Sequence, residues 1–296
     1  MTVAGPSTIK VPLLKFKVNE PTGNNPYTYL SALLQGNREK VKIIEILNQV
    51  TIMTELTIRK TLPSDTGQII EFTRNTFPWG GDYVPNAINE WISEGTAYVA
   101  VIKNHVVGVM NMVLIRETST AWLEGIRVHP PSYRRMGIGR ALTEYVLNEA
   151  VKNGIRHVML MIADWNEPSH RLARSLGFHE VLTLFTGVAK PSPVSIVRGE
   201  AMREVIRNAL RKTNGYYCMT RKHWLCTRAT EDFVMTIINE VYIGRGGIGL
   251  GEFSVGGPPT MPAKTEVLAT ENGDFENYYG RFIVYEKELN QAQAKA

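Results

Sequence analysis

A turn rich in glycine and arginine that leads into a helix constrains the fold of this chain more than any other feature. It reads RRMGIGRA and runs from Arg134 to Ala141, within the segment 121–181. The first N–H groups of a helix lack a partner inside the helix and carry partial positive charge, so they can hold an anion. Gly137 and Gly139 have no Cβ, which lets the backbone approach a phosphate closely. The turn therefore predicts a pyrophosphate site at the start of a helix.

Other phosphate-binding turns fit this sequence less well. The expected helix has apolar residues at helical spacing and ends at Asn153-Gly154. A P-loop needs Lys followed by Ser or Thr after its last glycine, whereas Arg140 and Ala141 follow here. The Rossmann fingerprint needs a third small residue where Leu142 stands. A glycine-capped helix without a ligand remains the alternative interpretation of the turn alone.

The sequence around the turn resembles the GNAT superfamily of N-acetyltransferases. The signature of this family is Arg or Gln, two variable residues, Gly, a variable residue, then Gly or Ala; Arg134, Gly137 and Gly139 match it. Further elements agree in order and spacing: Val-x-Pro at 128–130, a strand at 157–164, Asn166, and Leu-Gly-Phe at 176–178. The resemblance covers residues 56–188.

The resemblance implies an α/β fold, the acyl-CoA N-acyltransferase fold, in which helices cover both faces of a mixed sheet. From residue 56 the pattern predicts elements in the order β-α-α-β-β-β-α-β-α. We expect an N-terminal extension of unknown role (1–52), the acetyltransferase domain (53–189) and a smaller, β-rich α+β C-terminal domain (190–296). The loop at 79–85 and the C-terminal tail also resemble, more weakly, the histidine N-acetyltransferase-like group.

The resemblance further implies that acetyl-CoA binds along this segment. The turn would hold the pyrophosphate, and the backbone N–H of Ile126 or Val128 would donate to the carbonyl oxygen, because the two central strands separate in this family. Asn166 would contact the cofactor, although it equally suits the N-cap of the next helix. The expected cofactor-binding residues are Ile126, Arg127, Val128, Arg134, Arg135, Met136, Gly137, Ile138, Gly139, Arg140 and Asn166.

Acetyl transfer to an amine requires a base, because most free amines are protonated at pH 7. Glu124, on the strand LEGIRV, is the candidate catalytic residue. Alternation along the strand predicts that Trp122, Glu124 and Ile126 share one face. The alternative interpretation of Glu124 is a strand carboxylate paired with a neighbouring arginine.

The usual general acid of the family is missing. Many relatives place a tyrosine partway along the last helix, where this chain has Ala173. A thiol with a pKa near ~8.5 is a reasonable leaving group without full protonation. Tyr133, Tyr83, water or His170 are the substitutes that the sequence offers.

Composition narrows the class of protein. The 296 residues carry a net charge of +5, but residues 53–189 are electrically balanced. The arginines of the amphipathic helix expected at 199–212 lack interleaved aromatic residues, so a nucleic-acid partner is not favoured. No apolar run suggests a membrane span or secretory signal, so we expect a soluble, cytoplasmic protein.

Cys218 and Cys226, with six histidines, favour neither a disulfide scaffold nor a metal site, and we expect both cysteines to be reduced.

These observations predict an acetyl-CoA-dependent N-acetyltransferase whose acceptor is a small-molecule primary amine, such as a histidine-like free amino acid. Two alternatives stay open: acetylation of protein N-termini or lysines, and a non-catalytic acyl-CoA-binding regulatory protein. No pattern in the sequence indicates an oligomeric state.

Overall fold

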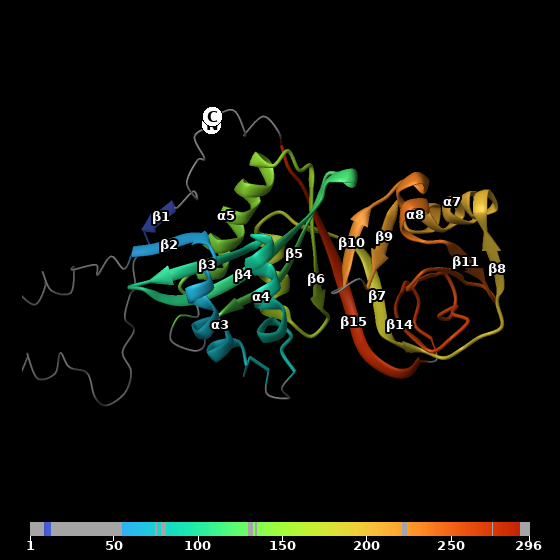
Figure 1. Cartoon of the computed structure of the whole chain (residues 1–296), viewed down its shortest axis with the longest axis horizontal. Coiled ribbons are helices and arrows are strands. Elements are labelled where there is room, and N and C mark those ends of the chain that lie inside the picture. The colour runs from blue at the N-terminus through green and yellow to red at the C-terminus, as the bar shows by residue number, and fades with distance from the viewer. Residues whose placement is uncertain are drawn as a thin grey trace, which may run out of the picture.

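The computed structural model describes residues 9–12, 55–74, 76–77, 81–129, 133, 135–220, 224–273 and 275–290 (Figure 1). The expected extension at 1–52 therefore lies outside the described residues, apart from strand β1 (Ile9–Pro12), which pairs with β2. Arg134, one of the expected pyrophosphate ligands, also lies outside them.

The predicted order of elements is confirmed from residue 55 onward. The elements are β2 (Glu55–Lys60), α3 (Thr66–Thr73), α4 (Val84–Glu94), β3 (Ala97–Ile102), β4 (His105–Ile115), β5 (Thr120–Val128), α5 (Ile138–Lys152), β6 (His157–Ala163), α6 (Glu167–Ser175) and β7 (His179–Ala189). Lys103 and Asn104 turn the β3–β4 hairpin with positive φ angles of 47° and 66°, which Asn tolerates better than most residues. The sheet is mixed, with helices on both faces, as expected.

The strand that completes this part of the sheet comes from the far end of the chain. β15 (Phe275–Glu288) lies between β6 and β7 and pairs antiparallel with both (Figure 1). The stretch 190–274 is thus inserted, in sequence, between two neighbouring strands. The large sheet therefore contains strands from both sides of the domain boundary that we expected at residue 190.

The inserted stretch is rich in strands. Its elements are β8 (Ser195–Arg198), α7 (Met202–Lys212), β9 (Tyr216–Met219), β10 (Leu225–Arg228), α8 (Glu231–Ile237), β11 (Glu240–Ile243), β12 (Ile248–Leu250), β13 (Phe253–Val255) and β14 (Thr265–Ala269). The hairpin of β9 and β10 forms a small sheet of its own, and β14 extends the large sheet beside β7. On α7, Arg203 and Arg207 pair with Asp232 and Glu231 of α8, which supports a solvated face on this helix rather than an anion-binding one.

The expectation of two reduced cysteines is wrong in the structure. Cys218 and Cys226 face each other across the antiparallel pair β9–β10 and form a disulfide. Both are completely buried. The composition argument failed because the hairpin register, which brings two residues eight positions apart into direct opposition, is not visible in a cysteine count.

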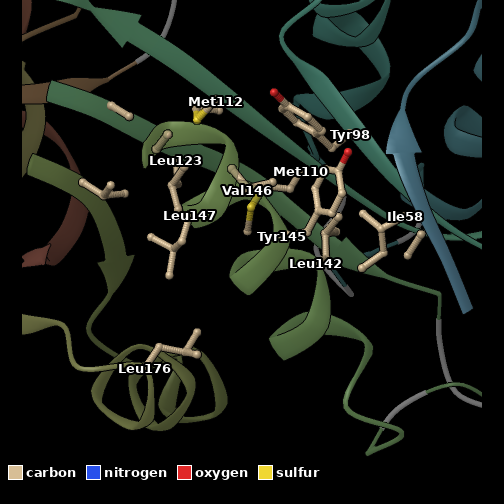
Figure 2. Packing of buried hydrophobic residues seen from close by; sticks show 14 of the residues in the cluster. Ile58, Tyr98, Met110, Met112, Leu123, Leu142, Tyr145, Val146, Leu147 and Leu176 are labelled. Carbon is tan, nitrogen blue, oxygen red and sulfur yellow. The ribbon is translucent and has the colours of Figure 1, made fainter. Parts of the chain in front are cut away.

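A hydrophobic core holds α5 against the sheet and so fixes the turn that precedes this helix. Figure 2 shows Leu142, Tyr145 and Val146 of α5 packed among side chains of the strands, including Tyr98 and Met110. Burying side chains of this size contributes roughly 1.5–3 kcal/mol each. A second core, on the opposite face, contains residues of α3 and α4 with Val99, Val106 and Val109.

Among the helices of the described residues, none combines the length and apolar character that a membrane crossing requires.

Candidate active site

Strand β5 contains a bulge beside Glu124. Val109 of β4 pairs with Arg127, and Asn111 pairs with Glu124, so one residue of β4 opposes two residues of β5. Gly125, at the bulge, has a φ of +65°, and a Cβ there would overlap the ring of Trp91. The bulge therefore requires glycine for its backbone conformation and for its contact with α4.

The bulge changes which side chains share a face, and the prediction that Ile126 lies on the same face as Trp122 and Glu124 is wrong. Ile126 packs against the core that contains α5. Glu124 lies opposite Asn111, whose side chain donates to it, while Val109, two residues from Asn111, belongs to the core with α3 and α4. One extra residue in the strand inverts the alternation that follows it. We call the face with Glu124 the acceptor face.

The central strands separate just beyond this point, as the resemblance implies. β5 and β6 pair in parallel only from Thr120–His157 to Leu123–Leu160, although both strands continue past these residues. The N–H of His129 donates to the carbonyl of Val107 on β4 at 2.8 Å. Because N–H groups alternate along a strand, those of Ile126 and Val128 point toward the space between β5 and β6.

The start of α5 lies against the same strands. Gly137 precedes the helix with a φ of +78°, and a Cβ at this position would meet no atom of the described residues within 4 Å. A Cβ at Gly139 would stand 3.5–3.8 Å from the side chains of Leu172, Val128 and Ile126. The N–H groups of the first helical turn thus emerge at the separated strands, with space beside Gly137. This arrangement fits a pyrophosphate at the helix N-terminus.

The side chains of the turn fall into two groups. Arg135 and Arg140 are exposed, and Arg140 reaches Glu144 at 3.2 Å and Ser175 Oγ at 2.7 Å. Ile138 is buried and Met136 half-buried, both in the core under α5. The exposed arginines therefore supply positive charge at this turn, and the apolar pair anchors the loop.

Asn166 acts as the N-cap of α6. Its side-chain oxygen accepts the N–H of Ser169 at 3.4 Å, which is a long hydrogen bond. The side-chain amide of this N-cap residue therefore makes only a weak hydrogen bond to the helix. The contact of Asn166 with a cofactor stays a prediction.

Arg127, which we expected at the cofactor, has its side chain on the acceptor face. Its Nε and Nη2 donate to the two oxygens of Asp82 at 2.7 and 3.1 Å. The guanidinium also lies over the rings of Phe77 and Tyr83, 5.0 and 5.6 Å from their centres. Cation–π contacts and the ion pair together hold the loop before α4 against β5. The side chain of Arg127 is therefore directed away from the expected cofactor site, and only its backbone could contact the cofactor.

Tyr83 brings a hydroxyl to the bulge. Although 37% of this residue is exposed, desolvation of the hydroxyl, followed by the negative charge of Glu124, raises the pKa of Tyr83 well above its ordinary value. The N–H of Gly125 opposes this shift through a hydrogen bond to the phenol. Tyr83 therefore stays protonated at neutral pH beside Glu124.

The position of the usual tyrosine, Ala173, is buried in the core. His170, one turn earlier, is also buried: its Nδ1 lies 2.8 Å from the hydroxyl of Tyr285, and its Nε2 lies 3.2 Å from the carbonyl oxygen of Ala163. The structure thus places this candidate acid in the interior. Both ring nitrogens are engaged in holding α6 to β15 and β6, so His170 is poorly placed to serve as a general acid.

Sequence reasoning missed two residues of the acceptor face, Asn111 and Asp82. Asn111 is completely buried, and its Nδ2 donates to Glu124 Oε1 at 2.8 Å. A signal existed, because Asn111 is the one polar side chain between Val106 and Ile115 in an otherwise apolar strand. Asp82 gave no such signal in its loop.

The sequence of this chain is similar to those of known acetyltransferases. Residues 67–178 match the model of the acetyltransferase (GNAT) family. The chain is 40% identical over 50 residues to the ribosomal protein bS18-alanine N-acetyltransferase of Escherichia coli K12. That match covers 17% of this chain and 34% of the relative, so the chain spans about a third of the length of the curated relatives it matches.

One solved structure shows a similar fold over most of this chain. The crystal structure of a proposed acetyltransferase from Thermoplasma acidophilum superposes with a TM-score of 0.51 at 17% identity, over 78% of this chain and 99% of that one. A structure of the E. coli ribosomal-protein-S18-alanine N-acetyltransferase aligns with a TM-score of 0.39 at 24% identity, over 46% and 84% of the two chains. The first match extends well beyond residues 67–178, so the shared fold includes part of the remaining chain.

Proposed function

Because residues 67–178 form an acetyltransferase domain of the GNAT family, we propose that this protein transfers the acetyl group of acetyl-CoA to a primary amine. One observation carries the proposal: β5 and β6 separate directly beside Glu124. The separation exposes backbone donors on one side, and the carboxylate stands on the other. Acetyl-CoA, when bound, supplies an acetyl group activated as a thioester.

The residues that would hold acetyl-CoA belong to β5, the turn and α5. The first N–H groups of α5, with Arg135 and Arg140, would bind the pyrophosphate. The N–H of Ile126 or Val128 would donate to the carbonyl oxygen and stabilise the negative charge that develops there. Ile126 and Val128 lie close to this helix start, because a Cβ at Gly139 would stand 3.7–3.8 Å from their side chains.

Glu124 would act as the base. As the amine nitrogen bonds to the carbonyl carbon and the carbon–sulfur bond breaks, Glu124 receives the proton that the nitrogen loses, directly or through water. The sulfur leaves as a thiolate, which its modest basicity permits without a dedicated acid. The buried amide of Asn111 orients the carboxylate for this role.

The cover over the acceptor face supports a small acceptor, such as a free amino acid of the histidine type. Trp122 of β5 and Met159 of β6 lie in one core with Cys218 and Met219 of β9 and with Cys226 of β10. The inserted hairpin therefore covers the part of this face next to Glu124. A short acceptor needs less of the face than an extended peptide does.

A second candidate acceptor is the N-terminus of a protein. The similarity to an enzyme whose name specifies a ribosomal alanine favours it. The chemistry at Glu124 would be the same, and only the length of the acceptor would differ.

A thiol-release assay tests the proposal. Acetyl-CoA is combined with single amino acids including L-histidine, with simple amines and with tetra-alanine, and the products are identified by mass spectrometry. We expect amine-dependent release of CoA, with a free amino acid as the best acceptor. Preference for tetra-alanine would favour the peptide alternative, and binding of acetyl-CoA without release would favour the non-catalytic one.

A further inference from the structure

Asn111 is completely buried, but only one end of its side-chain amide is hydrogen-bonded. Its Nδ2 donates to Glu124 Oε1 at 2.8 Å, whereas its Oδ1 has no hydrogen-bond partner among the described residues. A buried polar atom without a partner costs about 1–3 kcal/mol, so such atoms call for an explanation. Glu124 accounts for the amide NH₂ group of Asn111, but it does not account for the burial of Oδ1.

The position of Asn111 indicates what its oxygen can bind. The residue lies directly opposite Glu124 across the β4–β5 ladder, at the bulge and on the acceptor face. Trp122, two residues from Glu124 on the same strand, also has a buried ring nitrogen, Nε1, without a partner among the described residues. Among the described residues of β4 and β5, the buried side-chain atoms without a partner belong to Asn111, opposite Glu124, and to Trp122, two residues before it.

We propose that Asn111 is the residue that binds the acceptor amine, with its Oδ1 accepting one N–H while Glu124 takes the proton from the same nitrogen. This inference rests on the proposed function. An amide oxygen is a hydrogen-bond acceptor with no proton of its own to give, so it pairs with an N–H donor. The hydrogen bond between the two side chains fixes the distance between the two groups that meet the nitrogen.

The arrangement selects primary amines. A neutral primary amine keeps one N–H for Asn111 Oδ1 after another proton has been lost to Glu124 during transfer. A secondary amine has a single N–H, which the base removes, so no donor remains for Asn111. Its oxygen is then left buried and unpaired, which disfavours the secondary amine as an acceptor.

The test compares methylamine with dimethylamine, which have nearly equal basicity and differ in their number of N–H groups. Both are small enough for any acceptor site, and amine-dependent CoA release is measured for each after subtraction of the uncatalysed rate. The wild type should prefer methylamine by ~10-fold in kcat/KM, the equivalent of one hydrogen bond. In Asn111→Leu this preference should fall to within ~3-fold, with unchanged affinity for CoA.

Asn111→Asp distinguishes the role of the side-chain oxygen from the role of the donor to Glu124. It keeps an oxygen for the amine but replaces the donor to Glu124 with a second negative charge. The preference for methylamine should survive, while the acid limb of the pH–rate profile moves to higher pH because a like charge raises the pKa of Glu124. This variant also preserves the size of the side chain, so it serves if Asn111→Leu does not fold. Asn153→Leu, at the far end of α5, is the matched control and should retain the wild-type preference.

The outcomes are distinct. Unchanged selectivity in Asn111→Leu, or equal rates for both amines in the wild type, overturns the role of Asn111 and leaves the proposed function intact. A wild-type protein that releases no CoA with any amine overturns the proposed function, and the inference falls with it.

Discussion

Arg127 and Asp82 form a two-pronged ion pair across the acceptor face, with Nε and Nη2 donating to separate carboxylate oxygens at 2.7 and 3.1 Å. The Asp82 side chain is completely buried, and it also accepts the N–H of Val84 at the start of α4. The pair thus joins strand β5 to the loop that carries Tyr83.

Replacing Asp82 by alanine should destabilise the protein by roughly 3–5 kcal/mol, because the substitution leaves a mostly buried guanidinium without its partner. Urea unfolding measures this loss. The exposed pair of Arg171 and Glu167 on α6 provides the control, since Glu167→Ala should cost at most about 0.5 kcal/mol. Equal losses for the two variants would contradict the structural role of the Asp82 pair.

Gly125→Ala should abolish most activity and lower stability. The added Cβ collides with Trp91, and the positive φ is strained for alanine. Relief of both requires the bulge to rearrange, which moves Glu124 relative to Ile126. We expect a loss of stability of at least about 2 kcal/mol and a fall in kcat of ~100-fold or more.

Gly67→Ala is the matched control for this substitution. Gly67 lies in α3, and a Cβ there would stand more than 4 Å from every atom in the described part of the chain outside its own helix turn. Alanine should be neutral or stabilise by roughly 0.5–1 kcal/mol. A Gly125→Ala protein that is as stable and active as Gly67→Ala would show that the bulge is not required.

Much of the sheet and the turn that leads into α5 could be predicted from sequence, because period-two strands and a capped amphipathic helix are local patterns. The bulge at Gly125 could not, since glycine in a strand also fits regular pairing. That single residue placed Ile126 and Glu124 on opposite faces. The return of β15 between β6 and β7, and the disulfide of Cys218 with Cys226, depend on pairing between distant or turn-related segments. Local patterns carry no information about such pairing.

Arg140→Ala should weaken CoA binding by ~10-fold, because this exposed guanidinium lies beside the start of α5, where the pyrophosphate is expected. The loss should be greatest at low salt, since screening reduces an exposed charge interaction. Titration calorimetry at two ionic strengths measures both effects. Arg171→Ala on α6 should leave the affinity unchanged, and an equal loss in that variant would argue against a specific site.

Glu286 should make stability depend on pH in the acid range. Its burial alone would raise the pKa, but hydrogen bonds from Arg228 and Tyr216 outweigh burial and hold the pKa of Glu286 below its ordinary value. A carboxyl with a depressed pKa stabilises the fold above its unfolded pKa, and this stability is lost as pH falls through the folded pKa.

Glu286→Gln should therefore reduce the free energy of unfolding by about 2 kcal/mol at pH 7. The difference from the wild type should shrink as the pH falls below the ordinary glutamate pKa of 4.5. Denaturant unfolding from pH 7 to pH 3 measures it. A difference that stays constant across this range would contradict the ionised network around Glu286.

The transfer reaction at Glu124 is tested most directly by amine-dependent release of CoA from acetyl-CoA, measured for the wild type and for Glu124→Gln. We predict that the wild type releases CoA only when an amine is present. Glu124→Gln should reduce kcat by ~100-fold or more while it binds CoA with wild-type affinity, because a glutamine cannot accept the proton. Equal rates for the two proteins, or tight binding of acetyl-CoA with no release for any amine, would contradict this account.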